Sequence, residues 1–344
     1  MHGKMKYAVF LMVISFLSLP LMLRAAETQH DVLRKLEEGA KREGKVVWYG
    51  SMNLDEAIPF VKKFEQKYPF IKIDYMRSKG EVNANRVLAE TRAGKNQFDL
   101  ISGKLRALIF LKKMGLLEKY RSLEYKNYPE SFRDPEGYWI TQYLSTYCIG
   151  YNSRLVKPQD VPKSYEGLLD PKWKGKLAMD YYDYDWFTGL MEIMGRDKGL
   201  VYMQGLAKQE PIMRSGHTLL SQLLAAGEFS LSTMYLNSVA RMKKINAPVD
   251  WIRFDFPAPT SLTSISMFDK APHPFAAKLL YEFILSKEAN DFLPTVGRIS
   301  PRPDVPFPGI PKDFKFYPLS EALLTDVTDK NIKEYDRIFK KGPR

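Results

Sequence analysis

Three short polar segments of the sequence have the composition of anion-binding turns. They cover residues 50–53, 77–80 and 102–104, and each precedes a segment with the residue spacing of a helix. The first turn of a helix has unpaired backbone N–H groups and a partial positive charge, so it favours an anion. The Ser and Asn residues of these turns also suit ordinary helix caps. Each turn alone is therefore ambiguous, but three at one edge of a sheet would form a binding site for a small anion.

Side chains in or beside such turns are the candidates for direct ligand contact. Small hydroxyl and amide groups orient a ligand through hydrogen bonds, and aromatic rings provide apolar walls. Arg77, Lys79 and Lys104 would make the site positive, although each alone suits a solvated surface. Arg214 would add to that charge, and Asp185 would pair with the ammonium group of a zwitterionic ligand. The ten candidates for ligand contact are Ser51, Met52, Arg77, Ser78, Ser102, Tyr181, Asp185, Trp186, Tyr235 and Asn237.

The segments around the three turns alternate between the patterns of strands and helices. Residues 45–49 are β-branched and aromatic, whereas residues 54–68 repeat apolar side chains at the spacing of an amphipathic helix. Pro59 is unfavourable inside a helix, so we expect this helix to begin later than residue 54. Alternating strands and helices predict a mainly parallel sheet, whose ligands bind beyond the carboxyl ends of the strands. Further strands are predicted at residues 71–76 and 98–101, and further helices at residues 81–93 and 105–114.

The second half of the chain repeats the order of strand, polar turn and helix without repeating the sequence. Domains usually have about 100–200 residues, so the chain is long enough for two lobes with separate cores. A helix is expected to end at Gly227, because glycine commonly follows the last turn. Strands are predicted at residues 147–152, 177–179 and 229–234, and a short helix at residues 164–169.

The N-terminus has the pattern of a secretory signal peptide. Lys4 and Lys6 precede an apolar run without charges that extends to Leu23, and the small residues Ala25 and Ala26 follow it. The apolar run is close to the lower length limit for a membrane span. We therefore predict a cleaved signal peptide over residues 1–26, in preference to a membrane anchor, and a periplasmic location.

Composition excludes several classes of protein. The formal net charge is +12, but the lysines are scattered through helical patterns and no nucleic-acid-binding motif accompanies them. We therefore expect no nucleic-acid partner. Cys148 is the single cysteine, so an intrachain disulfide is impossible. The four histidines lack the spacing of metal ligands, and we expect neither a metal site nor a cofactor.

Several longer segments resemble one protein family. They include Phe98-Asp99-Leu100, the run Asp170-Pro171-Lys172-Trp173-Lys174-Gly175-Lys176 and the run Ala271-Pro272-His273-Pro274-Phe275. In this order they are similar to the family 1 extracellular solute-binding proteins, near their ferric-iron-binding branch, over residues 41–298. The resemblance implies the type 2 periplasmic-binding-protein fold. In this α/β fold, two lobes each contain a mainly parallel sheet flanked by helices, and two crossover strands join them.

The resemblance also implies how the chain is divided and what it does. A small-molecule ligand would bind in the cleft between the lobes and close it. The closed monomer would then dock on the permease subunits of an ABC importer. The expected divisions are the signal peptide (1–26), lobe 1 (27–147 and 251–298), lobe 2 (148–250) and a C-terminal extension packed on the lobes (299–344).

This chain differs from the iron-binding branch at the positions that would determine its ligand. Those relatives have two adjacent tyrosines after the strand that follows a Gly-Glu segment, and oxygen ligands suit Fe(III). Here the corresponding positions after Gly227-Glu228 are Asn237-Ser238, with Tyr235 two residues earlier. Tyr181-Tyr182 is a double tyrosine, but it follows an earlier strand. We therefore expect a small organic or phosphonate-type anion, with ferric iron or a ferric chelate as the alternative.

Two other classes of function stay open. Thiaminase-like enzymes resemble binders of this type and use a cysteine nucleophile, for which Cys148 is the candidate. It lies in a predicted crossover strand, where a buried thiol is inert, and no base is identifiable beside it. We therefore predict no catalytic residue and no enzyme. The other class is a ligand sensor that signals through a partner, which a neighbouring pair of permease and ATPase genes would argue against.

Overall fold

The computed structural model describes residues 29–311, 313–326 and 328–340. The predicted signal peptide lies outside these ranges. Within them, none of the helices is both long and apolar enough to cross a membrane.

Lobe 1 begins with three strands and three helices in alternation. Strand β1 pairs in parallel with β2 and with β3, so the predicted parallel sheet is confirmed. Helix α2 begins directly after Asn53 and contains Pro59, so the later start that we expected is wrong. Buried Phe60 and Phe64 anchor this helix to the core, and their packing compensates for the hydrogen bond that Pro59 cannot donate. The elements are β1 (Lys45–Gly50), α2 (Leu54–Lys67), β2 (Lys72–Arg77), α3 (Gly80–Arg92), β3 (Leu100–Lys104) and α4 (Leu105–Lys113).

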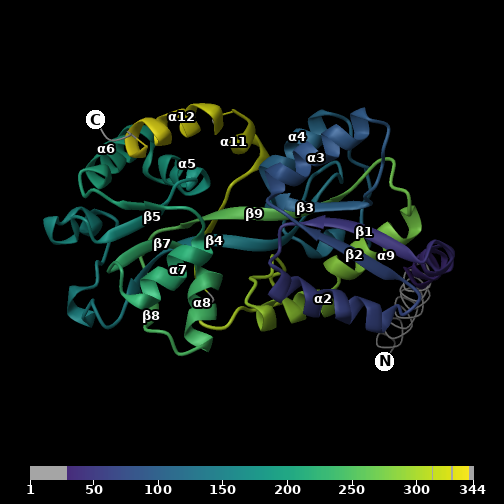
Figure 1. Cartoon of the computed structure of the whole chain (residues 1–344), viewed down its shortest axis with the longest axis horizontal. Helices are drawn as coiled ribbons and strands as arrows, with labels where there is room; N and C mark the ends of the chain where they lie inside the picture. The colour runs from purple at the N-terminus through teal and green to yellow at the C-terminus, as the bar shows by residue number, and fades with distance from the viewer. Residues whose placement is uncertain (1–28, 312, 327, 341–344) are drawn as a thin grey trace, which may run out of the picture.

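Two long strands pass from one lobe to the other, as the fold predicts. They are β4 (Ile140–Asn152) and β9 (Ala258–Met267), which pair antiparallel with each other. Beyond Thr146, β4 leaves β9 and pairs with strands of lobe 2. In the described residues, ten strands form one sheet, whose main order is β2-β1-β3-β9-β4-β7-β5-β6. Figure 1 shows the two lobes on either side of these crossover strands.

Pairing with β9 changes one predicted turn. Residues 102–104, expected as a turn, continue β3 because they pair antiparallel with Thr263, Ser264 and Ile265 of β9. The expected return to lobe 1 at residue 251 is also early. Strand β8 (Val249–Ile252) still pairs with the lobe 2 part of β4, and the chain returns with β9.

Lobe 2 repeats the order of strand, turn and helix, as predicted. Strand β5 pairs in parallel with β6 and β7. Gly227 ends α7 in the left-handed conformation, at φ 87°, where glycine has no steric cost. Helix α6 and strand β6 were not predicted. The elements are β5 (Leu177–Asp180), α5 (Tyr184–Met194), α6 (Arg196–Ala207), β6 (Ile212–Arg214), α7 (His217–Ala226), β7 (Leu231–Tyr235) and α8 (Leu236–Lys244).

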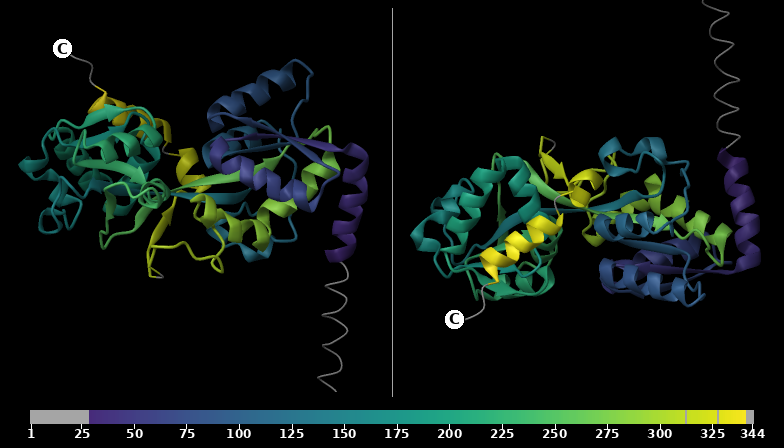
Figure 2. Two further views of the ribbon diagram at one scale, coloured as in Figure 1. Left: turned by 60° about the horizontal axis from the view of Figure 1, so that its bottom comes forward. Right: turned by 90° about the horizontal axis from the view of Figure 1, so that it is seen from above.

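The last part of the chain contacts both lobes. Helices α9 (Pro274–Leu285) and α10 (Lys287–Phe292) pack on lobe 1, and β10 (Phe316–Pro318) pairs with β9. Helix α11 (Glu321–Asp326) follows, and α12 (Thr328–Phe339) lies against α5 and α6 of lobe 2 (Figures 1 and 2). The short 3-10 helices are Tyr125–Asn127, Glu130–Phe132, Pro158–Asp160, Glu166–Leu169, Pro171–Trp173 and Leu293–Val296.

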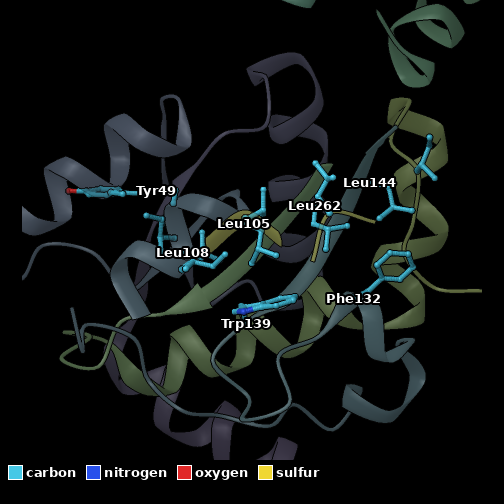
Figure 3. Packing of buried hydrophobic residues seen from close by; sticks show 14 of the residues in the cluster. Tyr49, Leu105, Leu108, Phe132, Trp139, Leu144 and Leu262 are labelled. Atoms are coloured by element: carbon cyan, nitrogen blue, oxygen red, sulfur yellow. The ribbon is translucent and has the colours of Figure 1, made fainter. Parts of the chain in front are cut away.

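Three clusters of buried side chains hold the fold together. One lies in lobe 1 around Trp48 and Phe60, and another in lobe 2 around Trp186 and Phe187. The third follows the crossover strands into both lobes; Figure 3 shows its lobe 1 part, around Leu105, Leu144 and Leu262. The lobes therefore have separate cores but share apolar packing along the hinge.

Candidate ligand-binding cleft

A cavity of about 500 Å³ lies between the two lobes. Lobe 1 contributes the loops that follow β1 and β2, together with the junction of β3 and α4. The carboxyl ends of these three strands therefore meet at one edge of the sheet, as predicted, although only two of them end in loops. Lobe 2 contributes the beginnings of α7 and α8. The lining side chains include Ser51, Asn53, Arg77, Ser78, Lys79, Lys104, Arg106, Tyr143, Tyr182, His217, Tyr235, Asn237, Ser238, Arg241 and Arg298.

Helix beginnings on the lobe 1 wall have backbone N–H groups available to a ligand. Among the described residues, no side chain caps α2, α3 or α4 at its first residue. A Cβ on Gly103 would lie 2.8 Å from the Cα of Gly80, so this pair of glycines lets β3 approach the start of α3 closely. The beginnings of α3 and α4 are consequently adjacent, and their partial positive charges add up at the cleft.

On the lobe 2 wall, two more helices begin without a side-chain cap from the described residues. Helix α7 starts after Gly216, and α8 starts after Tyr235. Asn237, near the start of α8, is 2% exposed and lines the cleft. Its side-chain oxygen has no hydrogen-bond partner in the described part of the chain. A buried amide without a partner is costly, so this group is positioned for a ligand or an ordered water molecule.

His217 and two tyrosines form an aromatic group beside the cleft. The Nε2 atom of His217 is 2.9 Å from a carboxylate oxygen of Asp183. Burial disfavours the charged imidazole, but Asp183 outweighs this and raises the pKa of His217 above its usual value. Tyr235 donates a hydrogen bond of 3.1 Å to the hydroxyl of Tyr147, and burial raises the pKa of Tyr235 to about 12. Both phenols are therefore protonated at neutral pH.

A buried ionic group, called the Asp185 cluster, connects the lobes at the hinge. It consists of Asp185 from α5, Lys104 and Arg106 from lobe 1, and Ser261 from β9. Lys104 Nζ is 3.1 Å from Asp185, Arg106 donates to the other carboxylate oxygen, and the Ser261 hydroxyl donates at 2.5 Å. Burial alone would raise the pKa of Asp185, but the two cations hold it well below its usual range.

A second ionic group, called the Glu56 cluster, connects the lobes at another part of the cleft. Glu56 of α2 is 2% exposed and accepts hydrogen bonds from Arg241 of α8 at 3.0 Å and from Arg298 at 2.9 and 2.5 Å. The Arg298 guanidinium also lies 4.4 Å from the centre of the Tyr143 ring. The pair between Glu56 and Arg241 joins the lobes, whereas Arg298 follows the last helices of lobe 1.

The structure brings half of the ten predicted residues to the cleft. Ser51, Arg77, Ser78, Tyr235 and Asn237 line it. Contact between the ligand and these five side chains stays a prediction.

The other five predicted residues do not line the cleft, which corrects our expectation for them. Met52 and Trp186 are fully buried in the cores of lobe 1 and lobe 2. Ser102 is also buried and accepts a hydrogen bond of 3.0 Å from the indole of Trp48. Tyr181 is exposed outside the cleft, whereas its neighbour Tyr182 lines it. The fifth residue, Asp185, is 2% exposed and pairs with the two cations of lobe 1, so its charge is already used within the protein.

Several cationic residues of the cleft were missed by sequence reasoning. Arg106, Arg241 and Arg298 line it, whereas Arg214, which we expected near it, is exposed and donates to the neighbouring carbonyl of Met213. One feature of the sequence could have placed Arg241 at the cleft. It follows Asn237 by four residues on α8, so both side chains lie on one face of that helix.

Two further observations concern the single cysteine and possible metal ligands. Cys148 is buried, and burial raises the pKa of its thiol, which makes it a poor nucleophile. Across the described ranges, no three His, Cys, Asp or Glu side chains are placed to hold a metal ion together.

Comparisons with known proteins agree with this architecture. The family model described as bacterial extracellular solute-binding protein matches residues 96–317. Iron uptake protein A1 of Synechocystis is 24% identical over 243 residues, which cover 65% of this chain. The match spans 66% of that relative, just under two thirds of its length.

Two solved structures show the same fold at low sequence identity. The periplasmic binding protein AfuA from Actinobacillus pleuropneumoniae, with exogenous fructose-6-phosphate bound, has a TM-score of 0.75 and 23% identity. The match covers 87% of this chain and 99% of the AfuA chain. The Trichodesmium protein IdiA (FutA), in complex with iron and citrate, has a TM-score of 0.71 and 21% identity. This match covers 86% of this chain and 99% of the Trichodesmium chain. Both structures have the type 2 periplasmic-binding-protein fold.

Proposed function

The chain belongs to the bacterial extracellular solute-binding proteins, and we propose that it captures a small phosphorylated or phosphonate-type anion in its cleft. In this proposal a cleaved signal peptide directs the chain to the periplasm. There the monomer delivers its ligand to the permease subunits of an ABC importer.

The observation that carries the proposal is the charge of the cleft lining. Among the described residues, the cationic side chains at the cleft are Arg77, Lys79, Lys104, Arg106, Arg241 and Arg298, and the acidic ones are Glu81 and Asp180. Asp180 already accepts hydrogen bonds from the backbone N–H groups of Tyr182 and Gly216. Guanidinium groups and uncapped helix beginnings are the groups that bind phosphate oxygens in proteins. The structure with bound fructose-6-phosphate has the same fold, which is consistent with a phosphorylated ligand.

Closure of the cleft would couple ligand capture to delivery. Arg77 and Lys79 belong to lobe 1, whereas His217, Asn237 and Arg241 belong to lobe 2. A ligand contacts both sets only when the lobes are closed, so it stabilises the closed arrangement over an open one. The permease can then distinguish loaded from empty protein by shape.

The proposal can be tested by calorimetry and thermal unfolding of the chain from residue 27. The probes are fructose 6-phosphate, 2-aminoethylphosphonate, fructose and inorganic phosphate. A ligand that binds the folded form alone adds about 2.7 kcal/mol of stability at a hundred times its Kd. We expect stabilisation by the phosphorylated or phosphonate probes and none by fructose. Stabilisation by fructose alone would contradict the proposal.

A matched pair of variants locates the binding. Arg241→Gln removes a cation from the cleft, whereas Arg214→Gln removes an exposed one outside it. We expect weaker anion binding for the first variant and unchanged binding for the second. Equal effects would show that the anion responds to the overall charge of the protein and not to the cleft.

Ferric iron or a ferric chelate is the second candidate ligand. In its favour, the Tyr147 and Tyr235 hydroxyls are adjacent and the His217 ring centroid lies 4.1 Å from that of Tyr235. A relative is also named as an iron uptake protein. Against it, both phenols are buried with raised pKa values, and Lys104 adds positive charge beside Tyr235. We expect ferric citrate to give no tyrosinate charge-transfer band; a band lost in Tyr235→Phe would reverse this assignment.

A further inference from the structure

We infer that the ligand carries two anionic groups, one at the Asp185 cluster and one at the Glu56 cluster. The inference rests on the proposed capture of a small anion and narrows its chemical class. It predicts a phosphorylated acid, such as a sugar acid phosphate, in preference to an ester with a single phosphate.

The first argument is the ratio of charges in each cluster. In the Asp185 cluster, one carboxylate pairs with two cations, Lys104 and Arg106. The Glu56 cluster has the same ratio, because one carboxylate pairs with Arg241 and Arg298. Asp55 lies 3.7 Å from Arg241, but it is 69% exposed and its charge is screened by water. Each cluster therefore has one positive charge in excess.

The second argument is that these excess charges face the cavity and are partly removed from water. The four cations of the two clusters line the cleft. The Nε atom of Arg106 is buried and finds no acceptor among the described residues. The carboxylate of each cluster neutralises only one of its two cations, so the remaining positive charge favours the arrival of an anion.

The third argument is the spacing of the clusters across the sheet. Lys104 of β3 is paired with Thr263 of β9, and Thr263 is paired with Tyr143 of β4. Neighbouring strands are about 4.8 Å apart, so the backbones of Lys104 and Tyr143 are separated by about 10 Å. Arg298 lies over the Tyr143 ring, which places the Glu56 cluster at that end of the row. An extended molecule with two charged groups can span a separation of this size and contact one cluster with each group.

The hydroxyl groups between the clusters suit the middle of such a ligand. Thr263, Tyr143 and Ser145 line this part of the cavity, and Ser51 lies 3.5 Å from the Tyr143 hydroxyl. These groups donate and accept hydrogen bonds, so they are complementary to the hydroxyls of a polyol chain. A hydroxylated chain with an anion at each end therefore matches the cleft along its whole length.

The test is a calorimetric comparison of 6-phosphogluconate, glucose 6-phosphate and gluconate at one pH and ionic strength. A second set is 3-phosphoglycerate, glycerol 3-phosphate and glycerate. We expect the best molecule with two anionic groups to bind at least about tenfold more tightly than either of its counterparts with one. The reason is that hydrogen bonds to a second charged group add to the binding free energy.

Two variants should each remove this advantage. Lys104→Gln leaves Asp185 paired with Arg106, and Arg241→Gln leaves Glu56 paired with Arg298, so neither variant exposes an unpaired buried carboxylate. In either variant we expect the molecules with two anions to bind no more tightly than those with one. The exposed residue Arg214 provides the matched control, and Arg214→Gln should retain the full difference.

The outcomes separate this inference from the proposed function. If glucose 6-phosphate and glycerol 3-phosphate bind as tightly as the molecules with two anions, the inference is overturned and capture of a phosphorylated anion stands. If none of the phosphorylated probes or phosphonates binds, both are overturned. If the advantage persists in Lys104→Gln and Arg241→Gln, the second anion binds elsewhere and the inference is again overturned.

Discussion

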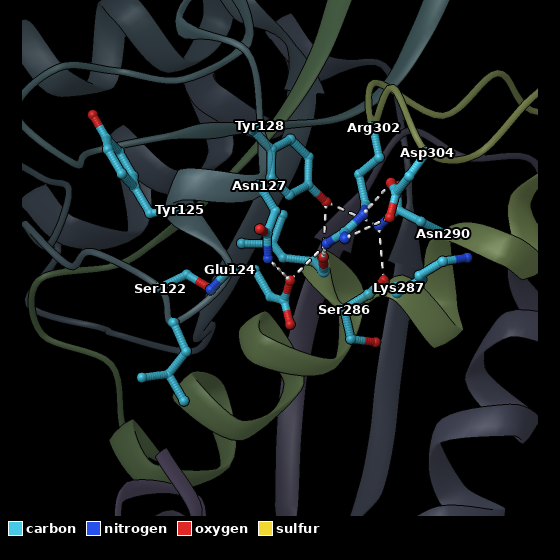
Figure 4. A network of polar contacts seen from close by, with 12 residues as sticks. Ser122, Glu124, Tyr125, Asn127, Tyr128, Ser286, Lys287, Asn290, Arg302 and Asp304 are labelled. Atoms are coloured by element: carbon cyan, nitrogen blue, oxygen red, sulfur yellow. Dashed lines mark hydrogen bonds and ion pairs between the residues drawn. The ribbon is translucent and has the colours of Figure 1, made fainter. Parts of the chain in front are cut away.

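Two ionic networks of the molecule have opposite ratios of carboxylates to cations. The Asp185 cluster has one carboxylate for two cations and lies where the lobes meet the cleft. A second network surrounds Arg302 within lobe 1, where this one cation pairs with Glu124 at 2.6 Å and with Asp304 at 3.0 Å (Figure 4). The Arg302 side chain is 6% exposed and the Asp185 side chain is 3% exposed, so the central charge of each network is shielded from water.

The difference between the networks indicates what each one does. Around Arg302, Asn290 donates to the hydroxyl of Tyr128 and accepts from Ser300, so the polar groups satisfy one another within lobe 1. That network fastens the C-terminal segment to the lobe, and Arg302, Glu124 and Asp304 do not line the cleft. The Asp185 cluster spans the two lobes, and its excess cation faces the cavity. Both networks therefore contain a buried central charge. Only the Asp185 cluster has an excess of positive charge beside a cavity, and this excess distinguishes the binding region.

Removal of Asp185 should have the largest effect on stability. In Asp185→Ala, Lys104 and Arg106 lose their shared carboxylate while they stay largely buried. Breaking a buried ion pair from one side typically costs about 3 kcal/mol, and we expect this loss in the free energy of unfolding. Urea denaturation measures it. A loss well below about 1 kcal/mol would mean that water reaches the cluster and that the comparison with Arg302 is unsound.

The pH dependence provides a second test of Asp185. Its pKa is depressed in the folded protein, so its contribution to stability is present above the ordinary carboxyl pKa of 3.8. This contribution is lost as the pH falls through the depressed value. The wild-type protein should consequently lose more stability between neutral and acidic pH than Asp185→Ala does. Identical acid profiles would contradict the ion pairing.

Removal of Arg302 should lower stability without changing ligand binding. In Arg302→Met the partly exposed carboxylates of Glu124 and Asp304 can regain water, so we expect a smaller loss of about 2 kcal/mol. Calorimetry with a ligand of the cleft should give the wild-type Kd. A weaker Kd in this variant would show that the C-terminal segment influences the cleft, and the separation of roles would fail.

His217 should produce a smaller, pH-dependent effect on lobe 2. Burial lowers its pKa and the neighbouring Asp183 raises it, with a net upward shift from the ordinary value of 6.5. The resulting stability is fully present below that value and is lost as the pH rises through the raised pKa of the folded state. We expect this decline to be smaller than the loss in Asp185→Ala, because burial of the imidazole opposes the effect of Asp183. Unfolding measured against pH should show this decline in the wild type and not in His217→Asn.

The sequence predicted features of the cleft that depend on local pattern. The loops containing Ser51 and Ser78 were found because each stands between a strand and a helix that are recognisable on their own. Ser102 was misplaced because its strand partner, β9, lies far along the chain and no local pattern reveals it. The same reason explains the missed arginines. Arg241 and Arg298 pair with Glu56 across 185 and 242 residues, so their positions depend on the complete fold.

The smallest expected effect comes from an exposed ion pair beside the Arg302 network. Lys287 contacts Asp291 at 2.6 Å, but their side chains are 51% and 52% exposed. Because water solvates both groups in the folded and unfolded states, Lys287→Ala should change the free energy of unfolding by less than about 0.5 kcal/mol. The measurement is urea denaturation of Lys287→Ala and Arg302→Met under the same conditions. A loss as large as that of Arg302→Met would show that proximity to the network, and not burial of charge, determines stability in this region.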